Sequence, residues 1–275
     1  MRKYLKLNTP IPGKLYFTLS ITAFAFVLLL WELGVTVGQL PPSHLPPPGA
    51  VARAAWDLAA DGLLGDIGIS FFRVTSGFLL AAAIGVPLGI LMGTLKVVEA
   101  FFEPLLAFFR YMPASAFIPL TIIWLSIFET QKIGVVFIGI FFQMVLMVMD
   151  VTKNVPQDLI DTAYTLGARP LEVFRRVILP AALPGIMDTL RITLGWAWTY
   201  VIVAELVAAN SGLGFLIMNA GRQLNTPDMF VGILTIGILG IICDMALKPL
   251  IVFYSLGWRG RYNSGPSSRS PKSGI

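Results

Sequence analysis

The sequence has little of what most enzymes and metal sites are built from. Its 275 residues include one cysteine, Cys243, and one histidine, His44, so the chain alone cannot form a disulfide, a cysteine metal site or a Cys–His catalytic pair. Charged residues make up 13% of the chain and hydrophobic residues 56%. Soluble globular domains carry about 25% charged residues. The composition therefore excludes an ordinary soluble domain.

The chain also lacks the residues with which ATP is bound and hydrolysed. A phosphate-binding loop of the Gly-x4-Gly-Lys-Ser/Thr type does not occur, since Gly13-Lys14 is followed by Leu15 and lacks the earlier glycine. The apolar runs hold no paired catalytic groups, which disfavours an intramembrane enzyme. We therefore expect a protein that is not an enzyme, with no catalytic residue, no metal ligand and no cofactor bound by this chain.

Long apolar runs predict membrane-spanning helices. The first, 15–38, follows a basic segment at 1–14 and is interpreted as a retained span, because it exceeds a signal-peptide core and no clear cleavage site ends it. Five further runs bring the predicted number of spans to six: 71–94, 97–128, 134–151, 188–207 and 230–256.

The run 97–128 is too long for one straight crossing, at about 48 Å if fully helical. Pro113 and Pro119 predict that it bends, and it reads either as one bent span or as an interfacial helix followed by a span.

The segments between the apolar runs have their own patterns. Within 39–70, the run Leu45-Pro46-Pro47-Pro48 is incompatible with helix, and helical spacing of apolar residues over 50–63 predicts an amphipathic helix at a membrane face. Gly85, Gly89 and Gly93 predict a face for close helix packing. The tail 257–275 is rich in Ser, Gly and Pro, and we expect it to be disordered.

The excess of 20 basic over 15 acidic residues follows a membrane pattern and indicates no nucleic-acid partner. With six spans and both termini in the cytoplasm, the outer loops hold only Arg53, Lys132 and Arg222. The inner segments hold Arg2, Lys3, Lys6, Lys14, Lys96, Lys153, Arg169, Arg175, Arg176, Arg259, Arg261, Arg269 and Lys272. This asymmetry predicts cytoplasmic termini and a cytoplasmic loop at 153–185.

That loop is predicted to form two short amphipathic helices joined by a glycine elbow. Asn154 is expected to cap the first helix, and Gly167 to end it in a left-handed conformation. Pro170 opens the second helix, and Pro180 and Pro184 are expected to close it before the next span.

The loop resembles, position for position, the cytoplasmic loop of ABC-importer permeases, written Glu-Ala-Ala-x3-Gly-x9-Ile-x-Leu-Pro. Further stretches over residues 41 to 256 are similar to permeases of nitrate, sulfonate, bicarbonate and taurine importers, of the taurine and alkanesulfonate kind. The matching stretches are Asp161-Thr162-Ala163 with Gly167, Leu45-Pro46-Pro47-Pro48, Arg110-Tyr111-Met112-Pro113, Ile118-Pro119-Leu120 with Trp124, Leu166-Gly167-Ala168, Val177-Ile178-Leu179-Pro180-Ala181-Ala182-Leu183-Pro184, Leu190-Arg191 with Leu194-Gly195, Val203-Ala204-Glu205-Leu206 and Gly212-Leu213-Gly214-Phe215.

The resemblance departs from the family pattern at two places. Asp161-Thr162 replaces the usual Glu-Ala, and the family's Trp-Phe-Gly-x-Gly-Glu is here Trp124-Leu125-Ser126-Ile127-Phe128-Glu129, without either glycine.

The resemblance implies an all-α type I importer permease in the inner (plasma) membrane, with residues 39–70 in the periplasm and a permease core at 71–256. It implies as partners a second copy of the chain, two cytoplasmic ATPase subunits that use ATP and Mg, and an extracytoplasmic substrate-binding protein. Coupling to the ATPase is then expected at Asp161, Thr162, Ala163, Tyr164, Leu166, Gly167, Ala168, Arg169, Pro170, Leu179 and Pro180.

Polar and aromatic residues within the spans are candidates for lining a translocation pathway. They are Arg110, Trp124, Trp196, Trp198, Tyr200 and Glu205. A pair with an arginine is expected for Glu205, a local pair with Asp188 for Arg191, and an i,i+4 pair for Asp244 and Lys248. Interfacial snorkelling is the competing interpretation of Arg110.

Alternatives remain open at this point. One is a stand-alone secondary transporter, although no convincing internal repeat is found. The expected solute is an oxyanion such as a sulfonate or taurine, nitrate or bicarbonate, and a vitamin precursor carried by a similar permease is the alternative.

Overall fold

The computed structural model describes residues 12–38, 41 and 43–263, with side chains described up to residue 249. This part of the chain is almost entirely helical and contains no strand. The helices are α1 Gly13–Thr36, α2 Pro48–Ala60, α3 Leu63–Thr94, α4 Lys96–Arg110, α5 Ile118–Leu125, α6 Glu129–Lys153, α7 Gln157–Thr165, α8 Pro170–Val173, α9 Leu179–Ala208, α10 Leu213–Arg222 and α11 Thr226–Asn263.

Among the described residues, five helices are long and apolar enough to cross a membrane, or six if the bent pair α4–α5 counts as one span. The predicted all-α membrane architecture is therefore confirmed. The described residues divide into two compact units, one lying within 12–64 and 216–233 and the other within 65–215 and 234–263.

In the first unit, Trp31 of α1 holds the proline-rich turn. Its indole N–H donates to the carbonyl of Pro46 at 2.9 Å, and its ring stacks on Phe230 with centroids 5.3 Å apart. The predicted amphipathic helix is found as α2, which begins at Pro48 because proline is tolerated in the first helical turn. It ends before Gly62, whose φ of +106° suits glycine.

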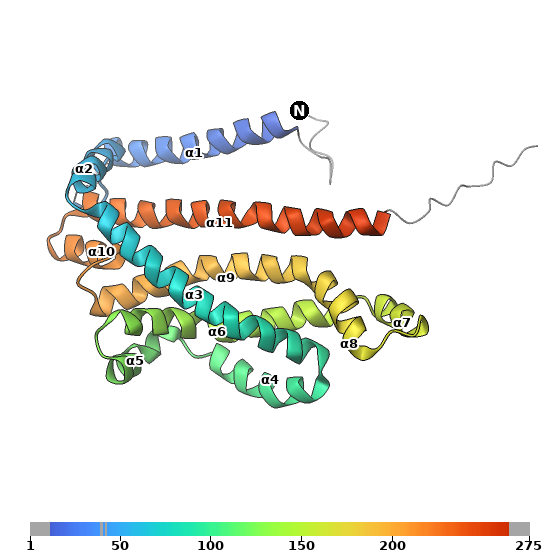
Figure 1. The fold of residues 1–275 in the computed structure, drawn as a ribbon. Coiled ribbons are helices and arrows are strands. Elements are labelled where there is room, and N and C mark those ends of the chain that lie inside the picture. The colour runs from blue at the N-terminus through green and yellow to red at the C-terminus, as the bar shows by residue number, and fades with distance from the viewer. Residues whose placement is uncertain (1–11, 39–40, 42, 264–275) are drawn as a thin grey trace, which may run out of the picture. The chain divides into compact units, whose positions relative to one another are not determined.

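In the second unit, α6 and α9 pack side by side, and α3 packs against α6 (Figure 1). A Cβ at Gly89 would lie 2.7 Å from the carbonyl oxygen of Val145, and one at Gly93 would lie 2.5 Å from Cβ of Thr152. The predicted glycine packing face on α3 is therefore confirmed. Met92, Leu106 and Val145 join α3, α4 and α6 in one apolar cluster.

The long run 97–128 is bent, as predicted from its prolines. Helix α4 ends at Arg110, and its axis makes an angle of 89° with the following helical segment, Ala114–Leu125. Pro113 precedes the short 3₁₀ turn Ala114–Phe117. Its ring is incompatible with a regular helix that would continue from α4 through this position.

The loop 153–185 contains the predicted elbow, because α7 ends before Gly167 and this residue has a φ of +83°. Two details of the prediction are wrong. Asn154 is the C-cap of α6 and makes no cap bond to α7, whose N-cap is Pro156. Pro180 and Pro184 do not close a helix, since α9 starts at Leu179 and runs through both.

Helix α8 is joined to α9 by a π-helical segment, Phe174–Ile178, so the chain is helical from Pro170 to Ala208. Pro180 lies in the first turn of α9, directly after the π-helical segment, which interrupts the regular α-helical hydrogen bonds at this place. The second predicted helix is thus the first part of a membrane-spanning one.

The ends of several predicted segments differ from the structure. Helix α3 begins at Leu63 and not at 71, and α11 continues to Asn263, where disorder is predicted from 257. Residues 264–275 of the predicted tail, 1–11 of the predicted N-terminal segment, and 39, 40 and 42 lie outside the described residues. The orientation of both termini stays a prediction from the charge distribution.

Candidate functional site

The first candidate surface is the end of the second unit formed by α7 and α8. These helices lie together at one end of α6 and α9, with α5 at the opposite end (Figure 1). The predicted coupling residues Asp161, Thr162, Ala163 and Tyr164 lie on α7. The rest follow along the same connection: Leu166 and Gly167 at the elbow, Ala168, Arg169 and Pro170 at the start of α8, and Leu179 and Pro180 at the start of α9.

Apolar side chains on this surface are exposed among the described residues. Leu166 is 83% exposed, and Tyr164 and Leu171 are also exposed. The local structure is fixed by short-range bonds, since Gln157 donates to Asp161 at 3.0 Å and the backbone N–H of Arg169 donates to Glu172 at 2.9 Å. The elbow is therefore an ordered, partly apolar projection.

Ion pairs hold the base of this projection. Glu99, at the start of α4, accepts from Lys153, at the end of α6, at 2.6 Å and from Lys96 at 2.9 Å. Lys153 is followed directly by the connection to α7. The pair therefore ties α4 to the residue where the projection begins.

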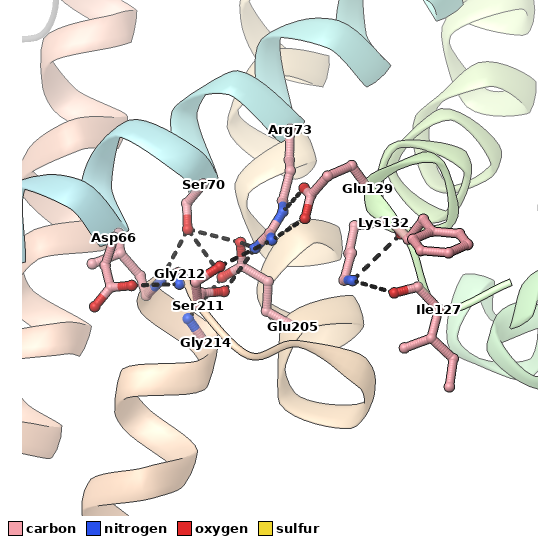
Figure 2. Close-up of polar contacts among 12 residues, drawn as sticks. Asp66, Ser70, Arg73, Ile127, Glu129, Lys132, Glu205, Ser211, Gly212 and Gly214 are labelled. Atoms are coloured by element: carbon pink, nitrogen blue, oxygen red, sulfur yellow. Dashed lines mark hydrogen bonds and ion pairs between the residues drawn. The ribbon is translucent and has the colours of Figure 1, made fainter.

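The second candidate site is a buried network of charges near the opposite end of α6 and α9, centred on Arg73 of α3. Figure 2 shows Arg73 between two carboxylates, Glu205 of α9 and Glu129 of α6. Its Nη1 lies 2.7 Å from Glu205, and its Nε and Nη2 lie 2.5 and 2.7 Å from Glu129. Arg73 and Glu205 are each 1% exposed. Three helices thus meet at one guanidinium group.

Every polar group of Glu205 has a partner, as a buried carboxylate requires. Ser70 donates to both carboxylate oxygens, at 2.7 and 3.0 Å, and the N–H of Gly214 donates at 2.8 Å. Arg73 in turn donates to the carbonyl of Ser211 at 2.8 Å.

The loop after α9 passes so close to this network that only glycine fits at position 212. Gly212 has a φ of +106°, and a Cβ there would lie 2.6 Å from Glu205 Oε1 and 2.7 Å from Arg73 Nη1. Its N–H donates to Asp66 of α3 at 2.6 Å (Figure 2). The stretches 203–206 and 212–215, which were matched separately in the sequence, meet here.

The α5–α6 connection borders the network through Glu129. Ser126 adopts a φ of +58°, a left-handed conformation at one of the two positions where the family pattern has glycine. Lys132 is buried, and its ammonium donates to the carbonyls of Ile127 and Phe128 at 3.2 and 3.4 Å. The two hydrogen bonds from Lys132 thus hold the α5–α6 connection, which here lacks the glycines of the family pattern.

The third candidate site is a cavity of about 380 Å³ at the break between α4 and α5. Arg110 and Met112 contribute from the break, Gln143 from α6, and Trp196 and Tyr200 from α9. Helices α4 and α5 both lie against α6, which packs beside α9 (Figure 1). A second hollow of about 310 Å³ shares Arg110, Met112 and Tyr200 with the first.

The predicted pathway residues therefore separate into two groups. Arg110, Trp196 and Tyr200 line the cavity. The other three do not: Trp198 is buried with its ring 6.4 Å from that of Phe71, Trp124 is exposed on α5, and Glu205 belongs to the charge network. A role in translocation stays a prediction for all six.

The predicted ion pairs of the spans are found in part. Glu205 has its arginine partner, and Asp244 lies 3.0 Å from Lys248. The partner predicted for Arg191 is wrong, because Arg191 binds Asp244 of α11 with two nitrogens. The guanidinium reaches this carboxylate on a neighbouring helix side-on, through Nε and Nη2, and forms no hydrogen bond to Asp188.

The Arg73 network as a whole was not predicted. The sequence feature that indicates such a network is the occurrence of charged residues in or beside apolar runs, where an unpaired charge is costly. These residues are Arg73, Glu129 and Glu205. Sequence spacing gives no way to tell which of them pair, because residues more than 130 positions apart are joined.

Comparisons with known proteins agree with the fold. The sequence profile described as "Binding-protein-dependent transport system inner membrane component" matches residues 85–250. A probable ABC transporter permease protein of Brucella melitensis is 40% identical over 231 residues, which cover 84% of this chain and 93% of that protein. The taurine transport system permease protein TauC of Escherichia coli is 35% identical over 239 residues, which cover 85% and 87%.

The fold is also found among solved structures. A chain of the methionine ABC transporter MetNI, in an inward-facing conformation, aligns with a TM-score of 0.63 and 23% identity over 70% of this chain and 95% of that chain. The matched profile covers more than half of the chain, and the relatives are similar over most of their length. The chain therefore belongs to the binding-protein-dependent transport system inner membrane components, the multi-pass permease subunits of ABC importers.

Proposed function

We propose that this chain is one half of the translocation pathway of an ABC importer. Two copies would form the pathway, a substrate-binding protein would deliver the solute from outside, and two separate ATPase subunits would bind ATP and Mg. Family membership supports this composition, and the absence of a phosphate-binding loop from the sequence agrees with ATP hydrolysis in another chain.

The proposed coupling contact is the projection formed by α7 and α8. The observation that carries it is the helical run from Pro170 to Ala208, which connects an exposed apolar surface directly to the cavity residues of α9. A displacement of α8 would reach Trp196 and Tyr200 without passing through a flexible loop, although the π-helical segment gives the run one point of bending.

The proposed solute is an oxyanion, such as a sulfonate or taurine, nitrate or bicarbonate. Similarity to the taurine permease of Escherichia coli supports this class, and so does the single arginine in the cavity. A non-anionic vitamin precursor is the alternative within the same family, and it would leave the guanidinium of Arg110 without a role in transport.

Replacing Leu166 by Asp tests the coupling contact. Leu166 is almost fully exposed, so the change should leave the fold intact and place a charge in the proposed ATPase contact. Leu224→Asp is the matched control, since Leu224 is 81% exposed and lies in a loop predicted to face outside. Both variants would be purified in detergent, and co-purifying ATPase would be identified by its phosphate-loop peptide.

We expect Leu166→Asp to lose most of the bound ATPase and Leu224→Asp to retain it. Equal retention by both variants would place the contact elsewhere. Solute uptake into proteoliposomes that continues without ATP would favour the stand-alone secondary transporter, and the proposed function would then be wrong.

A further inference from the structure

The cavity at the α4–α5 break lies where a membrane-spanning segment loses its helical hydrogen bonds. Residues 111–113 connect two helices that meet at 89°. Non-helical backbone at membrane depth is tolerated where it is buried in protein or borders a polar cavity, because lipid offers it no hydrogen bonds. The break is thus a place where a polar ligand can be accommodated inside the bundle.

The charge of Arg110 is not balanced by a described side chain. Four other cations of this unit form ion pairs with carboxylates, namely Arg73, Lys153, Arg191 and Lys248, and Lys132 donates to two backbone carbonyls. Arg110 instead donates to the phenol oxygen of Tyr111 at 3.0 Å, with its guanidinium 4.9 Å from that ring. No carboxylate partner of Arg110 is found in the described part of the chain.

Arg110 is exposed in the single chain and lines the open cavity, where a guanidinium without a carboxylate partner favours an anionic ligand. A guanidinium has five N–H donors, and the bond to Tyr111 uses one of them. Carboxylate and sulfonate groups offer paired oxygens that match the remaining fork, and such charge-assisted bonds are stronger than neutral ones.

The rest of the cavity is aromatic. Phe109 and Phe142 stack with centroids 5.1 Å apart, and Trp196 is partly exposed at the wall. Tyr200 lies against Gly139, where a Cβ would come within 2.4 Å of its ring. The tyrosine ring is therefore packed closely against α6, and aromatic side chains make up much of the cavity wall.

No acidic residue lines the cavity, whose uncharged polar groups are Gln143, Thr199 and Tyr200. An ammonium group on the ligand would find no carboxylate there. A small inorganic oxyanion would use Arg110 but leave the aromatic walls in contact with water. The volume of about 380 Å³ is in the range that holds organic ligands, roughly 300–1,000 Å³.

We infer that this cavity binds organic monoanions that combine one sulfonate or carboxylate group with an uncharged, flat apolar body. Arg110 binds the oxyanion, and Trp196 with the stacked phenylalanines covers the body. The inference rests on the proposed function, and it narrows the proposed oxyanions to organic sulfonates and carboxylates, so that taurine, nitrate and bicarbonate would be the weaker ligands of this cavity.

Equilibrium binding of radiolabelled benzenesulfonate to the permease, purified with its ATPase in lipid nanodiscs, tests the site. Unlabelled taurine and nitrate serve as the zwitterionic and inorganic competitors. We expect benzenesulfonate to bind about tenfold or more tightly than either, because only it satisfies both the arginine and the aromatic wall. Equal affinities for the three probes, or no binding of benzenesulfonate, would overturn the inference.

Substitutions assign the binding to named groups. Arg110→Gln should weaken benzenesulfonate binding about tenfold or more, and Arg110→Lys should weaken it less, since the charge remains but the planar fork is lost. Trp196→Ala should weaken binding of benzenesulfonate while leaving nitrate affinity unchanged. Arg222→Gln and Trp56→Ala replace the same residue types on exposed surfaces outside the cavity and should bind as the unaltered protein does.

The binding site and the proposed function can be refuted separately. Bound ATPase and ATP-driven uptake, measured on the same preparation, report the proposed function. A complex that retains both while Arg110→Gln binds benzenesulfonate normally refutes the site alone. Loss of the ATPase from the unaltered protein refutes the proposed function, whatever the probes do. If Arg110→Gln does not fold, as judged from its melting temperature, the Trp196→Ala result decides.

Discussion

Replacing Arg73 by Met should destabilise the protein more than any other single loss of charge in the described part of the chain. The substitution keeps much of the side-chain volume and removes the guanidinium that contacts Glu205, Glu129 and the carbonyl of Ser211. Glu205 would keep the bonds from Ser70 and Gly214 but would be a buried anion without a cation.

The magnitude follows from burial. Removing one partner of a buried ion pair typically costs about 3–5 kcal/mol, because the remaining charge stays desolvated. The side chains of Arg73 and Glu205 are 1% and 0% exposed, so the full range applies to this pair. Glu129 adds little, because its side chain is 45% exposed and water can replace the lost bonds.

The control is Lys248→Met, which breaks an ion pair between partly exposed groups. Lys248 is 53% exposed, and its partner Asp244 keeps Arg191, so the cost should stay below about 1 kcal/mol. The free energy of unfolding of each purified variant would be measured by denaturant titration in detergent micelles. The double variant Arg73→Met/Glu205→Gln should recover part of the loss, because it removes the uncompensated charge.

A cost of Arg73→Met no larger than that of Lys248→Met would refute the reasoning. It would mean that Glu205 is protonated or hydrated in the folded protein. The buried network would then contribute to the position of the loop after α9 and not to stability.

Three further predictions concern the backbone and can be checked on the same purified protein. Gly89→Ala should lower the melting temperature, because its Cβ would clash with Val145 and Val148, whereas Gly68→Ala, in open space on the same helix, should leave it unchanged or raise it. Ser126→Val should cost about 1–2 kcal/mol and Ser126→Gly close to zero, since a φ of +58° strains a β-branched residue most. Gly167→Pro should abolish ATP-dependent uptake, because proline cannot adopt a φ of +83°, and intact uptake would contradict the coupling role of the elbow.

The number and nature of the spans could be predicted because they depend on local composition. An apolar run long enough to cross a bilayer needs no partner to be recognised. The same approach missed the first eight residues of α3, since Asp66 and Ser70 make that stretch look like a polar connection. Both residues bind the backbone of the loop after α9. Asp66 accepts a hydrogen bond from the N–H of Gly212, and Ser70 accepts one from the N–H of Leu213.

Helical spacing in the sequence also predicts which aromatic residues of α9 share a face and which lie on different faces. Each helical residue turns by about 100°, so positions four apart share a face and positions two apart lie on nearly opposite faces. Trp196 and Tyr200 accordingly line the cavity together, while Trp198 is buried on another side. The partner of Arg191 could not be derived in this way, because Asp244 lies on a different helix.

Helix α9 links all three candidate sites, and their order along it limits how it can move. Glu205 is held near one end by ion pairs and hydrogen bonds that would be costly to break while buried. Leu179, at the other end, continues through the π-helical segment into the projection, whose apolar side chains Leu166 and Leu171 are exposed. A force applied at the projection would therefore turn α9 about its Glu205 end, and the resulting displacement would pass through Trp196 and Tyr200. The cavity, which contains the break between α4 and α5, is the place where that motion changes the shape available to a ligand.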